Sequence, residues 1–456
     1  MRFTASVTIG APAARVFAWH ARDGAFERLV PPWESLKIIE RRGGIEDGAR
    51  TVLEMRAGPV PVRWTAVHRD YIAGEQFRDE QRGGPFAHWV HTHRVTARSP
   101  GVSVLDDDID YMPPLGPLGA LADPIFVRPR LERTFRYRHA MTKADIEFHE
   151  RYPTRPLRIA ITGGSGLIGR HLVPFLTTAG HQVIRLARGG SATDAGTANW
   201  EPTTGAIDRE KLDGLDAVVH LAGANIAGQR WSDAWKREIR DSRVGPTGRL
   251  CAALAALPSP PRVLVSSSAI GYYGDRGSDV LTEASAPGTG FLSDVGVEWE
   301  EATAPAAQAG IRVVLARTGI VLTPAGGALQ QMLLPFRLGA GGPLGPGTQY
   351  QSWIGIDDML GAIVHAIHTE AITGPMNATA PEPVPQREFA RTLGRVLHRP
   401  ALVPAPAFAL RLMLGEMADP LLLASARVLP ERLVQTGFVF RHPAVEGCLR
   451  HLLGQP

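Results

Sequence analysis

The sequence contains very little cysteine, and its two cysteines, Cys251 and Cys448, lie far apart. Without a paired spacing they exclude a disulfide framework and a cysteine metal site, and they fit a reducing compartment. The N-terminal segment lacks the charged start and apolar stretch of a signal peptide, and no run of 18 apolar residues exists that would span a bilayer. We therefore expect a cytoplasmic protein with no membrane partner.

Lysine is almost as scarce, because only four lysines occur among 456 residues and arginine carries nearly all the basic charge. The net charge is +4, and no run of basic residues is long enough to follow a phosphate backbone. We therefore expect no nucleic-acid partner. The length indicates two or three domains rather than one.

Residues 1–151 combine short β-like segments with a helix at each end. Runs such as "SLKIIERR", "ARTVLEMR" and "HWVHTHRVTA" are separated by glycine-rich turns. The stretch "RPRLERTFRYRHAMTKADIEFHERY" carries apolar residues at helical spacing and predicts one long helix. A helix of that length behind antiparallel strands indicates an α+β fold with the helix laid on the sheet. The prolines of 152–156 mark a linker.

From 157 to 400 the pattern changes to alternating strands and helices. The runs "LRIAIT", "DAVVHLAG", "RVLVSSSA" and "IRVVLARTGIVL" are continuously apolar rather than alternating. Such runs fit strands that are buried on both faces, as in a doubly wound parallel sheet of the α/β class. Residues 401–456 predict a small C-terminal domain of short helices.

A glycine turn joins the first strand and helix of this second region, with Gly163, Gly166 and Gly169 spaced G-x-x-G-x-x-G. Such a turn lets the backbone approach a pyrophosphate, and the next helix directs its free N–H groups at the phosphates. The predicted dinucleotide-binding residues of the turn are Gly163, Gly164, Ser165, Gly166, Leu167, Ile168 and Gly169.

The end of the second strand distinguishes NADP from NAD. Sites for NAD usually carry an acidic residue there that binds the ribose 2′-hydroxyl. This sequence has Ala187 at that point, followed by Arg188, with Arg185 two residues before the alanine. A guanidinium can hold a 2′-phosphate, and no carboxylate repels it. We therefore predict NADP as the cofactor, with NAD less favoured; Arg188 is the cofactor contact and Arg185 a surface strand residue.

The motifs "TGGSGLIG", "DAVVHLAG", "VLVSSSAIGYYG", "LARTGIVL" and "QSWIGIDDM" resemble the extended short-chain dehydrogenase/reductase superfamily, also called NAD-dependent epimerase/dehydratase. The resemblance is greatest to its atypical, sugar nucleotide epimerase-like branch, which has a small C-terminal domain, and it covers 157–454. It implies that the strand ends beside the cofactor are formed by His220, Leu221, Ala222, Gly223, Ser266 and Ser267. It also implies that Ser268 stands where the superfamily has its catalytic serine.

The superfamily's catalytic Tyr-x-x-x-Lys pair is absent, because none of the four lysines follows a tyrosine by four residues. In that pair the lysine lowers the pKa of the tyrosine, which then transfers the proton. The positions where the pair is expected hold Leu292 and Gly296. Two interpretations follow: either Tyr272 or Tyr273 transfers the proton while Ser268 positions a carbonyl, or the domain binds NADP without using it.

Several other side chains are candidates for the site or its surroundings. Glu283 is a possible carboxylate partner, although a loop or helix-capping role is favoured. Three arginines are candidates for contact with an anionic substrate or a phosphate, although a structural salt bridge is favoured for each: Arg230, Arg243 and Arg317. The resemblance implies pocket residues Gln351, Ser352 and Trp353, and helix-capping residues Asp357 and Asp358.

The first region resembles the START-like, polyketide cyclase/dehydrase (SRPBCC) superfamily in its strand–helix opening, its "PPWE" turn and its long closing helix. The resemblance implies a cavity for a hydrophobic small molecule, lined by Trp33, Trp89 and His91. His91 and His93 share one strand face, but two imidazoles are not a metal site without a third ligand, so no metal is predicted. Alternate acids along a later strand are expected to be solvated: Asp106, Asp108 and Asp110.

The leading hypothesis is a protein of two modules. A START-like domain captures or presents an unidentified apolar small molecule, and an NADP-binding oxidoreductase or epimerase-like domain reduces or isomerises it. The alternative is a non-catalytic NADP-dependent sensor or scaffold, which the missing Tyr/Lys pair favours.

Overall fold

The computed structural model describes residues 1–456 except 58–59, 115, 153–154 and 190–195. Its described residues form two compact units. The first contains Met1–Arg155, Pro174–Gly180 and His451–Pro456, and the second contains Pro156–Val173 and His181–Arg450. The predicted linker includes 153–154, which lie outside the described residues. Residues 401–450 belong to the second unit, so the separate C-terminal domain stays a prediction.

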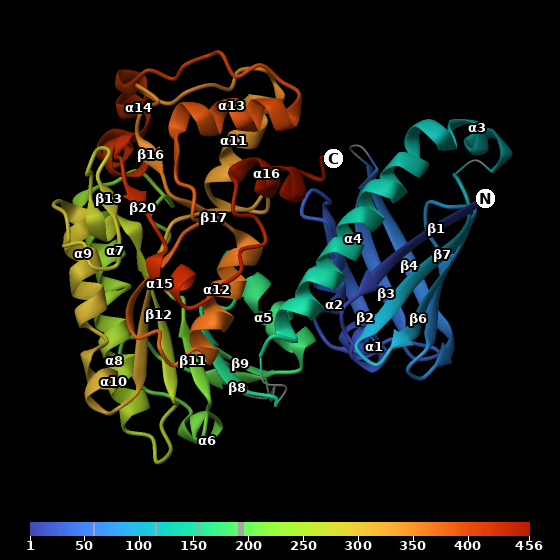
Figure 1. Cartoon of the computed structure of the whole chain (residues 1–456), viewed down its shortest axis with the longest axis horizontal. Helices are drawn as coiled ribbons and strands as arrows, with labels where there is room; N and C mark the ends of the chain where they lie inside the picture. The colour runs from blue at the N-terminus through green and yellow to red at the C-terminus, as the bar shows by residue number, and fades with distance from the viewer. Residues whose placement is uncertain (58–59, 115, 153–154, 190–195) are drawn as a thin grey trace. The chain divides into compact units, whose positions relative to one another are not determined.

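The first unit is built on a seven-stranded antiparallel sheet in the order β1-β7-β6-β5-β4-β3-β2 (Figure 1). The strands are β1 (Arg2–Ile9), β2 (Leu36–Arg42), β3 (Arg50–Ala57), β4 (Val60–Ile72), β5 (Gln76–Gly83), β6 (His88–Ser99) and β7 (Val102–Met112). The helices are α1 (Ala13–Ala21), α2 (Ala25–Leu29), α3 (Pro117–Phe126) and α4 (Arg128–His149). The α+β fold predicted for this region is confirmed.

The 22-residue helix α4 packs on one face of this sheet, as its apolar spacing predicts. Its Leu131 and Phe135 join Phe3, Ile109 and Tyr111 of the outer strands in one buried cluster. Because side chains alternate along a strand, every second residue of β7 enters this interior. The acids predicted to be solvated lie on the opposite face of β7: Asp106, Asp108 and Asp110.

The second unit is built on a seven-stranded parallel sheet in the order β10-β9-β8-β11-β12-β14-β18. Its strands are β8 (Arg158–Thr162), β9 (Gln182–Ala187), β10 (Thr197–Asn199), β11 (Ala217–His220), β12 (Val263–Ala269), β14 (Arg312–Thr318) and β18 (Gly374–Ala378). Residues of β8, β11 and β12 are almost all buried, which explains their continuous apolar runs. The predicted Rossmann-type sheet is confirmed.

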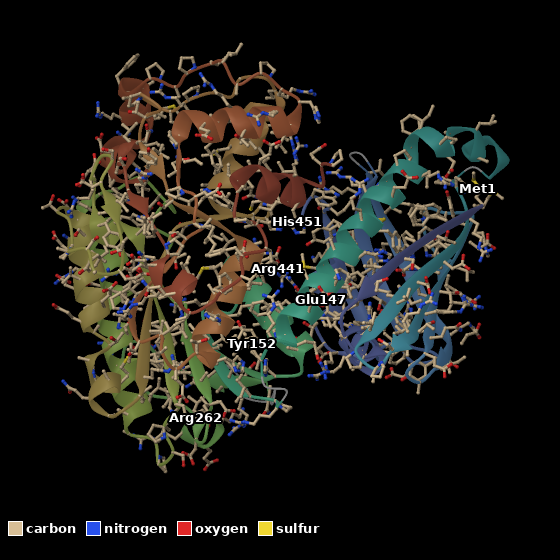
Figure 2. All side chains as sticks on the ribbon, viewed as in Figure 1. Met1, Glu147, Tyr152, Arg262, Arg441 and His451 are labelled. Atoms are coloured by element: carbon tan, nitrogen blue, oxygen red, sulfur yellow. The ribbon has the colours of Figure 1, made fainter. Side chains whose placement is uncertain are left out.

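Helices cover both faces of the parallel sheet, with α8 and α9 along one side and α5 and α12 along the other (Figure 1). Side chains fill the space between these elements (Figure 2). The helices are α5 (Gly169–Ala179), α6 (Arg209–Leu212), α7 (Asp233–Asp241), α8 (Val244–Ala255), α9 (Phe291–Glu301), α10 (Ala304–Gln308), α11 (Gly327–Arg337), α12 (Ile356–His368), α13 (Gln386–Leu397), α14 (Ala407–Leu414), α15 (Glu431–Gln435) and α16 (Val445–Leu453). Among the described helices none is long and apolar enough to cross a membrane.

Short elements join the C-terminal segment to the sheet's carboxyl edge. A parallel pair links β13 (Val280–Leu281) with β20 (Arg427–Val428), and an antiparallel pair links β16 (Tyr350–Gln351) with β19 (Val384–Pro385). The strands β15 (Ile320–Leu322) and β17 (Trp353–Gly355) also pair. The helical turns η1 (Ile270–Tyr273), η2 (Gly415–Met417) and η3 (Asp419–Leu423) lie near them in the sequence. Strand order reverses between β8 and β11, and ligands of such sheets bind at the carboxyl ends beside that reversal.

Candidate functional site

The predicted glycine turn connects β8 to α5 and has little room for side chains. Gly163 adopts φ +66°, and a Cβ there would lie 2.8 Å from the carbonyl carbon of Leu221. A Cβ on Gly169 would lie 2.3 Å from the Gly163 carbonyl oxygen, and the Gly166 N–H donates to that same oxygen. Gly164 is different, because its Cβ would have no atom closer than 3.6 Å. The turn therefore requires glycine at positions 163 and 169, whereas the protein atoms around position 164 leave room for alanine.

The structure brings this turn against the end of β11. The Leu221 and Ala222 N–H groups both donate to the Thr162 hydroxyl, the last residue of β8. The first turn of α5 presents backbone N–H groups and the positive end of its dipole beside the turn. Phosphates bind at such a junction through backbone donors alone, so the geometry fits the pyrophosphate of a dinucleotide. The predicted turn and the backbone of 221–223 thus form one cradle.

The end of β9 carries the residues on which the choice between NADP and NAD depends. The strand ends at Ala187, and Arg188 follows it as an exposed residue. Arg185 is exposed on the strand, with its side chain stem beside Gly164. Residues 190–195, which follow, lie outside the described part of the chain. No acidic side chain therefore occupies the end of this strand, where NAD-specific sites place one.

The His220 side chain has a different role from the predicted cofactor contact. Its ring is almost fully buried, with Nδ1 2.7 Å from the Thr162 hydroxyl and Nε2 2.9 Å from the Thr247 hydroxyl. Burial lowers the pKa of His220 to about 4, so the ring stays neutral at physiological pH. The imidazole ties β8 to α8, and only the backbone of His220 remains for the cradle.

The three serines at the end of β12 point in different directions. Ser266 is fully buried, and its hydroxyl has no partner among the described residues. Ser267 is half-buried. Ser268 is 3% exposed and donates to Glu300 Oε1 at 2.6 Å. This hydrogen bond gives the Ser268 hydroxyl a structural partner and does not support its predicted role in positioning a substrate carbonyl.

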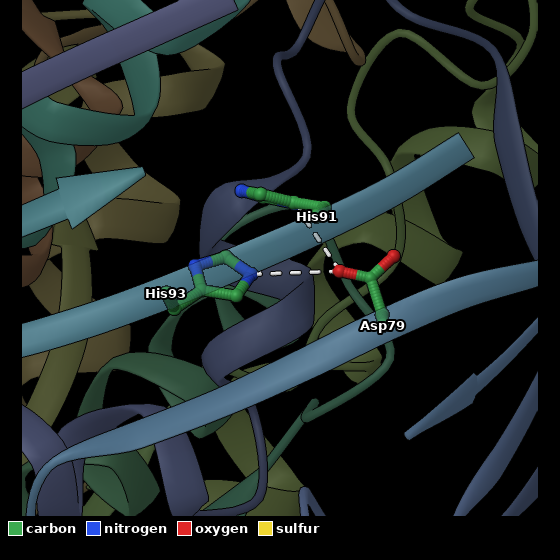
Figure 3. A group of neighbouring side chains, drawn as sticks. All are labelled: Asp79, His91 and His93. Atoms are coloured by element: carbon green, nitrogen blue, oxygen red, sulfur yellow. Dashed lines mark ion pairs between the residues drawn. The ribbon is translucent and has the colours of Figure 1, made fainter. Parts of the chain in front are cut away.

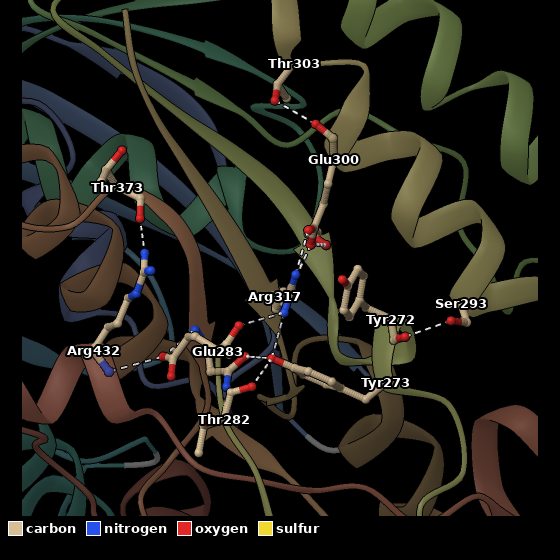
Figure 4. A network of polar contacts seen from close by, with 12 residues as sticks. Tyr272, Tyr273, Thr282, Glu283, Ser293, Glu300, Thr303, Arg317, Thr373 and Arg432 are labelled. Carbon is tan, nitrogen blue, oxygen red and sulfur yellow. Dashed lines mark hydrogen bonds and ion pairs between the residues drawn. The ribbon is translucent and has the colours of Figure 1, made fainter. Parts of the chain in front are cut away.

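Tyr273 is fully buried below the sheet's carboxyl edge (Figure 4). Its hydroxyl donates to Asn377 Oδ1 at 2.7 Å, and it accepts from Arg317 at 3.0 Å. Burial raises the pKa of Tyr273, which opposes formation of a phenolate. The ring of Tyr272 lies under the Arg317 guanidinium, 3.5 Å from it. Both rings therefore contact the arginine. The bonded hydroxyl and raised pKa of Tyr273 oppose its predicted proton transfer, whereas the role of Tyr272 stays a prediction.

Arg317 and Glu300 form a buried ion pair at the centre of this group (Figure 4). The guanidinium donates to both carboxylate oxygens at 2.8 Å, and the two side chains are 3% and 9% exposed. The salt-bridge interpretation of Arg317 is therefore correct, and its role as an anion contact is not supported. Ser268, Tyr273 and Arg317 form one network that fixes β12, η1 and β14.

A pocket of about 790 Å³ lies beside this network, at the carboxyl edge of the parallel sheet. Helix α9 contributes one wall through Leu292 and Gly296, the positions where the Tyr/Lys pair was expected. Aromatic side chains form much of the rest: Trp231, Phe291, Trp299 and Tyr350. The described lining residues do not include the predicted catalytic side chains: Ser268, Tyr272 and Tyr273. The pocket therefore lies next to the network, but the polar side chains of the network do not line it.

Arg243 is the charged side chain that enters both the pocket and the cradle. It lines the pocket, and a Cβ on Gly223 would lie 3.2 Å from its guanidinium carbon. It is 7% exposed and donates to the Ile239 and Ala224 carbonyls, while among the described residues no carboxylate pairs with it. Burial without a counter-ion lowers the pKa of Arg243 to about 10. An unpaired buried guanidinium favours an anionic ligand.

Other predicted residues are distributed around the pocket in different ways. Gln351 and Ser352 line it, whereas Trp353 is fully buried with its indole N–H on the Glu382 carbonyl. Arg230 does not line it and lies beside Gly415. One wall of the pocket is formed by the C-terminal segment Asp419–Ala424, which no sequence pattern predicted.

Two acids bind backbone amides rather than ligands. Glu283 accepts from the N–H groups of Asn377 and Arg432, as its predicted loop or capping role implies. Asp358 accepts from the N–H groups of Arg441 and His442, so it caps that loop instead of its own helix α12. Burial raises the pKa of Asp358 to about 6. The expectation that Asp357 and Asp358 cap α12 is therefore corrected for Asp358.

A second cavity, of about 180 Å³, lies inside the first unit. Trp89 and His91 line it as predicted, together with apolar residues of the sheet. Trp33 does not line it, because its ring packs against Tyr137 and beneath the Arg133 guanidinium. Two of the three residues predicted to line the cavity therefore do so, and Trp33 does not.

Comparison with family models divides the chain into three parts. Residues 1–147 match the polyketide cyclase / dehydrase and lipid transport model, and residues 159–377 match the NAD dependent epimerase/dehydratase family. Residues 405–452 match a domain of unknown function. Both resemblances inferred from the sequence are therefore confirmed.

Individual proteins with similar sequences extend this result. An epimerase family protein of Mycobacterium tuberculosis is 44% identical over 298 residues, which are 65% of this chain and 98% of that protein. The human epimerase family protein SDR39U1 is 34% identical over 300 residues, 65% of this chain and 100% of that protein. Both relatives match the part of the chain that holds the cradle and the pocket.

Two solved structures are similar at the level of the fold. One, described as a nucleoside-diphosphate sugar epimerase from Corynebacterium glutamicum, has a TM-score of 0.80 with 33% identity and covers 99% of this chain and 90% of its own. The other, human SDR39U1 with NADPH, has a TM-score of 0.60 with 33% identity and covers 65% of this chain and 99% of its own. The corynebacterial structure therefore spans both units.

The glycine turn provides a test of nucleotide binding. We expect Gly169→Ala to weaken binding of a nicotinamide dinucleotide at least tenfold, because its Cβ would lie 2.3 Å from the Gly163 oxygen and deform the cradle. Gly248→Ala on α8 is the matched control, since it lies outside the turn and its Cβ would have no atom closer than 3.7 Å. Calorimetric titration of both variants measures this, with circular dichroism to check folding. Equal affinities would contradict the assignment of the cradle.

The buried ion pair between Arg317 and Glu300 predicts that removing one partner lowers the stability of the fold. Arg317→Met should lower the free energy of unfolding by about 3–5 kcal/mol, because it leaves the Glu300 carboxylate buried and uncompensated. The double variant Arg317→Met/Glu300→Leu should recover part of that loss, since no charge remains buried. Denaturant unfolding measures both. If the double variant is as unstable as the single one, the pair does not have this role.

Proposed function

This chain belongs to the epimerase family of NAD(P)-binding proteins, and we propose that it is an NADPH-dependent oxidoreductase or isomerase of a hydrophobic, anionic small molecule. The observation that carries the proposal is the aromatic pocket beside the glycine cradle, with the buried Arg243 between them. The dinucleotide would lie along the turn at 163–169, with its reactive end toward the pocket. The cradle suits such a group because its backbone segments approach so closely that Cβ atoms at Gly163 and Gly169 would clash with neighbouring backbone.

The preference for NADPH is supported by the end of β9. Ala187 stands where an acid would bind a free 2′-hydroxyl, and the exposed Arg188 can pair with a 2′-phosphate. The structure of human SDR39U1, 33% identical, was solved with NADPH. Three other solved structures with the same fold, at 20% identity or less, hold NAD, so NAD stays the competing cofactor.

The substrate class follows from the lining of the pocket. Trp231, Phe291 and Trp299 offer a large apolar surface, which a hydrophobic body covers better than a sugar does. Arg243 would hold an anionic group, either of the substrate or of the cofactor, through charge-assisted hydrogen bonds. The corynebacterial relative is described as a nucleoside-diphosphate sugar epimerase, and a sugar nucleotide is the competing substrate class.

The chemistry available to the chain's own residues is limited. When bound, NADPH supplies a hydride, and the pocket excludes water and orients the acceptor carbon. Tyr350 is the phenol that lines the pocket, and we assign it the proton that the missing Tyr/Lys pair would have delivered. Ser268, Tyr272 and Tyr273 support the pocket from beneath.

A second candidate is a non-catalytic NADPH sensor. It is favoured by one specific observation: Leu292 and Gly296 stand where the catalytic pair is expected, while the hydroxyl groups of Ser268 and Tyr273 are bonded to protein partners. In either case the first unit would bind a hydrophobic small molecule in its own cavity, and the two modules would act on one ligand.

Stopped-flow mixing of NADPH-loaded protein with a panel of hydrophobic keto acids and aldehydes separates the two candidates. For the enzyme we expect loss of NADPH absorbance with at least one panel member, and Tyr350→Phe should slow it about 10²–10⁴-fold with NADPH affinity unchanged. Binding of NADPH without any turnover across the panel favours the sensor. Turnover that Tyr350→Phe leaves unchanged would contradict the role given to Tyr350.

Two arginines should affect cofactor binding differently. We expect Arg188→Ala to weaken NADPH binding about tenfold and to leave NADH unchanged, because it contacts only the 2′-phosphate. Arg243→Met keeps the apolar stem on Trp299 and should weaken both dinucleotides, about 10–100-fold, if it binds the shared phosphates. Arg240→Met is the control, since Arg240 is exposed and paired with Glu298. Calorimetry of the three variants with both cofactors measures these affinities. Parallel losses in Arg188→Ala would overturn the NADPH preference.

A further inference from the structure

Four side chains of the first unit gather on the inner face of its antiparallel sheet. Asp79 on β5 is paired in register with His91 on β6, and Asp107 on β7 is paired with His93 on β6. Because His91 and His93 are two residues apart, they project from the same face of their strand. The register therefore places two carboxylates on either side of two imidazoles, and all four are screened from solvent.

The distances within this group match a metal coordination sphere. The Asp79 Oδ2 atom lies 3.2 Å from His91 Nδ1 and 3.6 Å from His93 Nε2 (Figure 3). The three atoms are all within 4.8 Å of one another. A divalent ion about 2.0–2.1 Å from each ligand sets neighbouring ligand atoms roughly 3.0–3.4 Å apart. The two measured separations are close to that spacing, so one ion placed between the three atoms would reach them with small shifts of the side chains.

Asp107 completes the arrangement from the other side of the rings. Its Oδ1 atom lies 2.8 Å from His91 Nε2 and 2.7 Å from His93 Nδ1, the nitrogens that face away from Asp79. Its other oxygen lies 2.6 Å from Nε2 of His139, on α4. Histidines that bind metals characteristically direct their second ring nitrogen at a carboxylate, which fixes the tautomer and the ring orientation. A single carboxylate placed behind both rings is what such a site needs.

We propose that Asp79, His91 and His93 bind one divalent transition-metal ion, and that Asp107 orients the two histidines. Two imidazoles and one carboxylate suit zinc, ferrous iron, cobalt or nickel better than calcium or magnesium. This inference does not depend on the function proposed for the second unit.

The open side of this site faces the cavity. Asp79, His91 and His93 all line the 180 Å³ cavity, whose other walls include Leu53, Trp64 and Phe77. Three protein ligands leave coordination positions free, as in catalytic rather than structural metal sites. The half-buried Arg138 lines the same cavity. The two carboxylates balance the ion, so the arginine favours a further anion, and the expected exogenous ligand is a carboxylate or enolate with an apolar body.

Two carboxylates face the imidazoles, Asp79 on one side and Asp107 on the other. They would balance a divalent cation with both rings neutral, because metal ligation requires the unprotonated nitrogens.

The test uses the full-length, untagged protein. After dialysis against a chelator, titration with Co²⁺ should produce visible d–d absorption that saturates at one equivalent, and Zn²⁺ should abolish it by competition. His93→Gln and Asp79→Ala should each lose this saturable signal. His88→Gln is the matched control, because His88 lies on the same strand with an exposed side chain on the opposite face, and it should bind as the wild type does.

Asp107→Asn distinguishes orientation from coordination. It should keep one equivalent of Co²⁺ but weaken the affinity about 10–100-fold. Circular dichroism and dinucleotide binding by the second unit serve as folding checks for each variant. Absence of saturable Co²⁺ absorption in the wild type would overturn the proposal, and so would an unchanged signal in His93→Gln and Asp79→Ala; either result would leave a hydrogen-bonded His/Asp cluster only.

Discussion

The second unit depends on one close approach of backbone to backbone. The turn after β8 and the end of β11 meet where Gly163 leaves no space for a side chain. Thr162 bonds the two strand ends together, and His220 extends the link to α8. The cradle, the position of Arg243 and the rim of the pocket all follow from this junction. A change there would reach the cofactor and substrate regions at once.

The polar residues that resemble the superfamily's catalytic group have a structural use here. Ser268, Tyr273 and Arg317 satisfy one another and Glu300 in a buried network, while the pocket wall beside them is apolar. Buried charges are stable only when paired, so this network cannot release its members to a substrate without cost. Chemistry in the pocket must use groups on its other walls. The loss of the Tyr/Lys pair and the burial of these hydroxyls are thus two parts of one rearrangement.

The sequence predicted the fold more completely than the site. Apolar runs, the glycine turn and the long helix at 128–149 are local signals, and the structure confirms each of them. The partners of the His220 side chain could not be predicted, because one of them is Thr247, 27 residues away on another helix. Asp79 and Asp107 were missed for the same reason. Their approach to His91 and His93 is set by strand register, which no spacing in the sequence reveals.

The alternation of β6 makes its length a strict requirement. Its inner face presents His91 and His93, and the next residue, Thr92, lies on the other face, where its hydroxyl accepts from Arg78. Insertion of one residue ahead of this stretch would shift the pairing by one and turn both imidazoles outward, with Val90 and Thr92 in their places. The sheet would keep its hydrogen bonds but lose the cluster. Substitutions are therefore tolerated more readily in this strand than changes in its length.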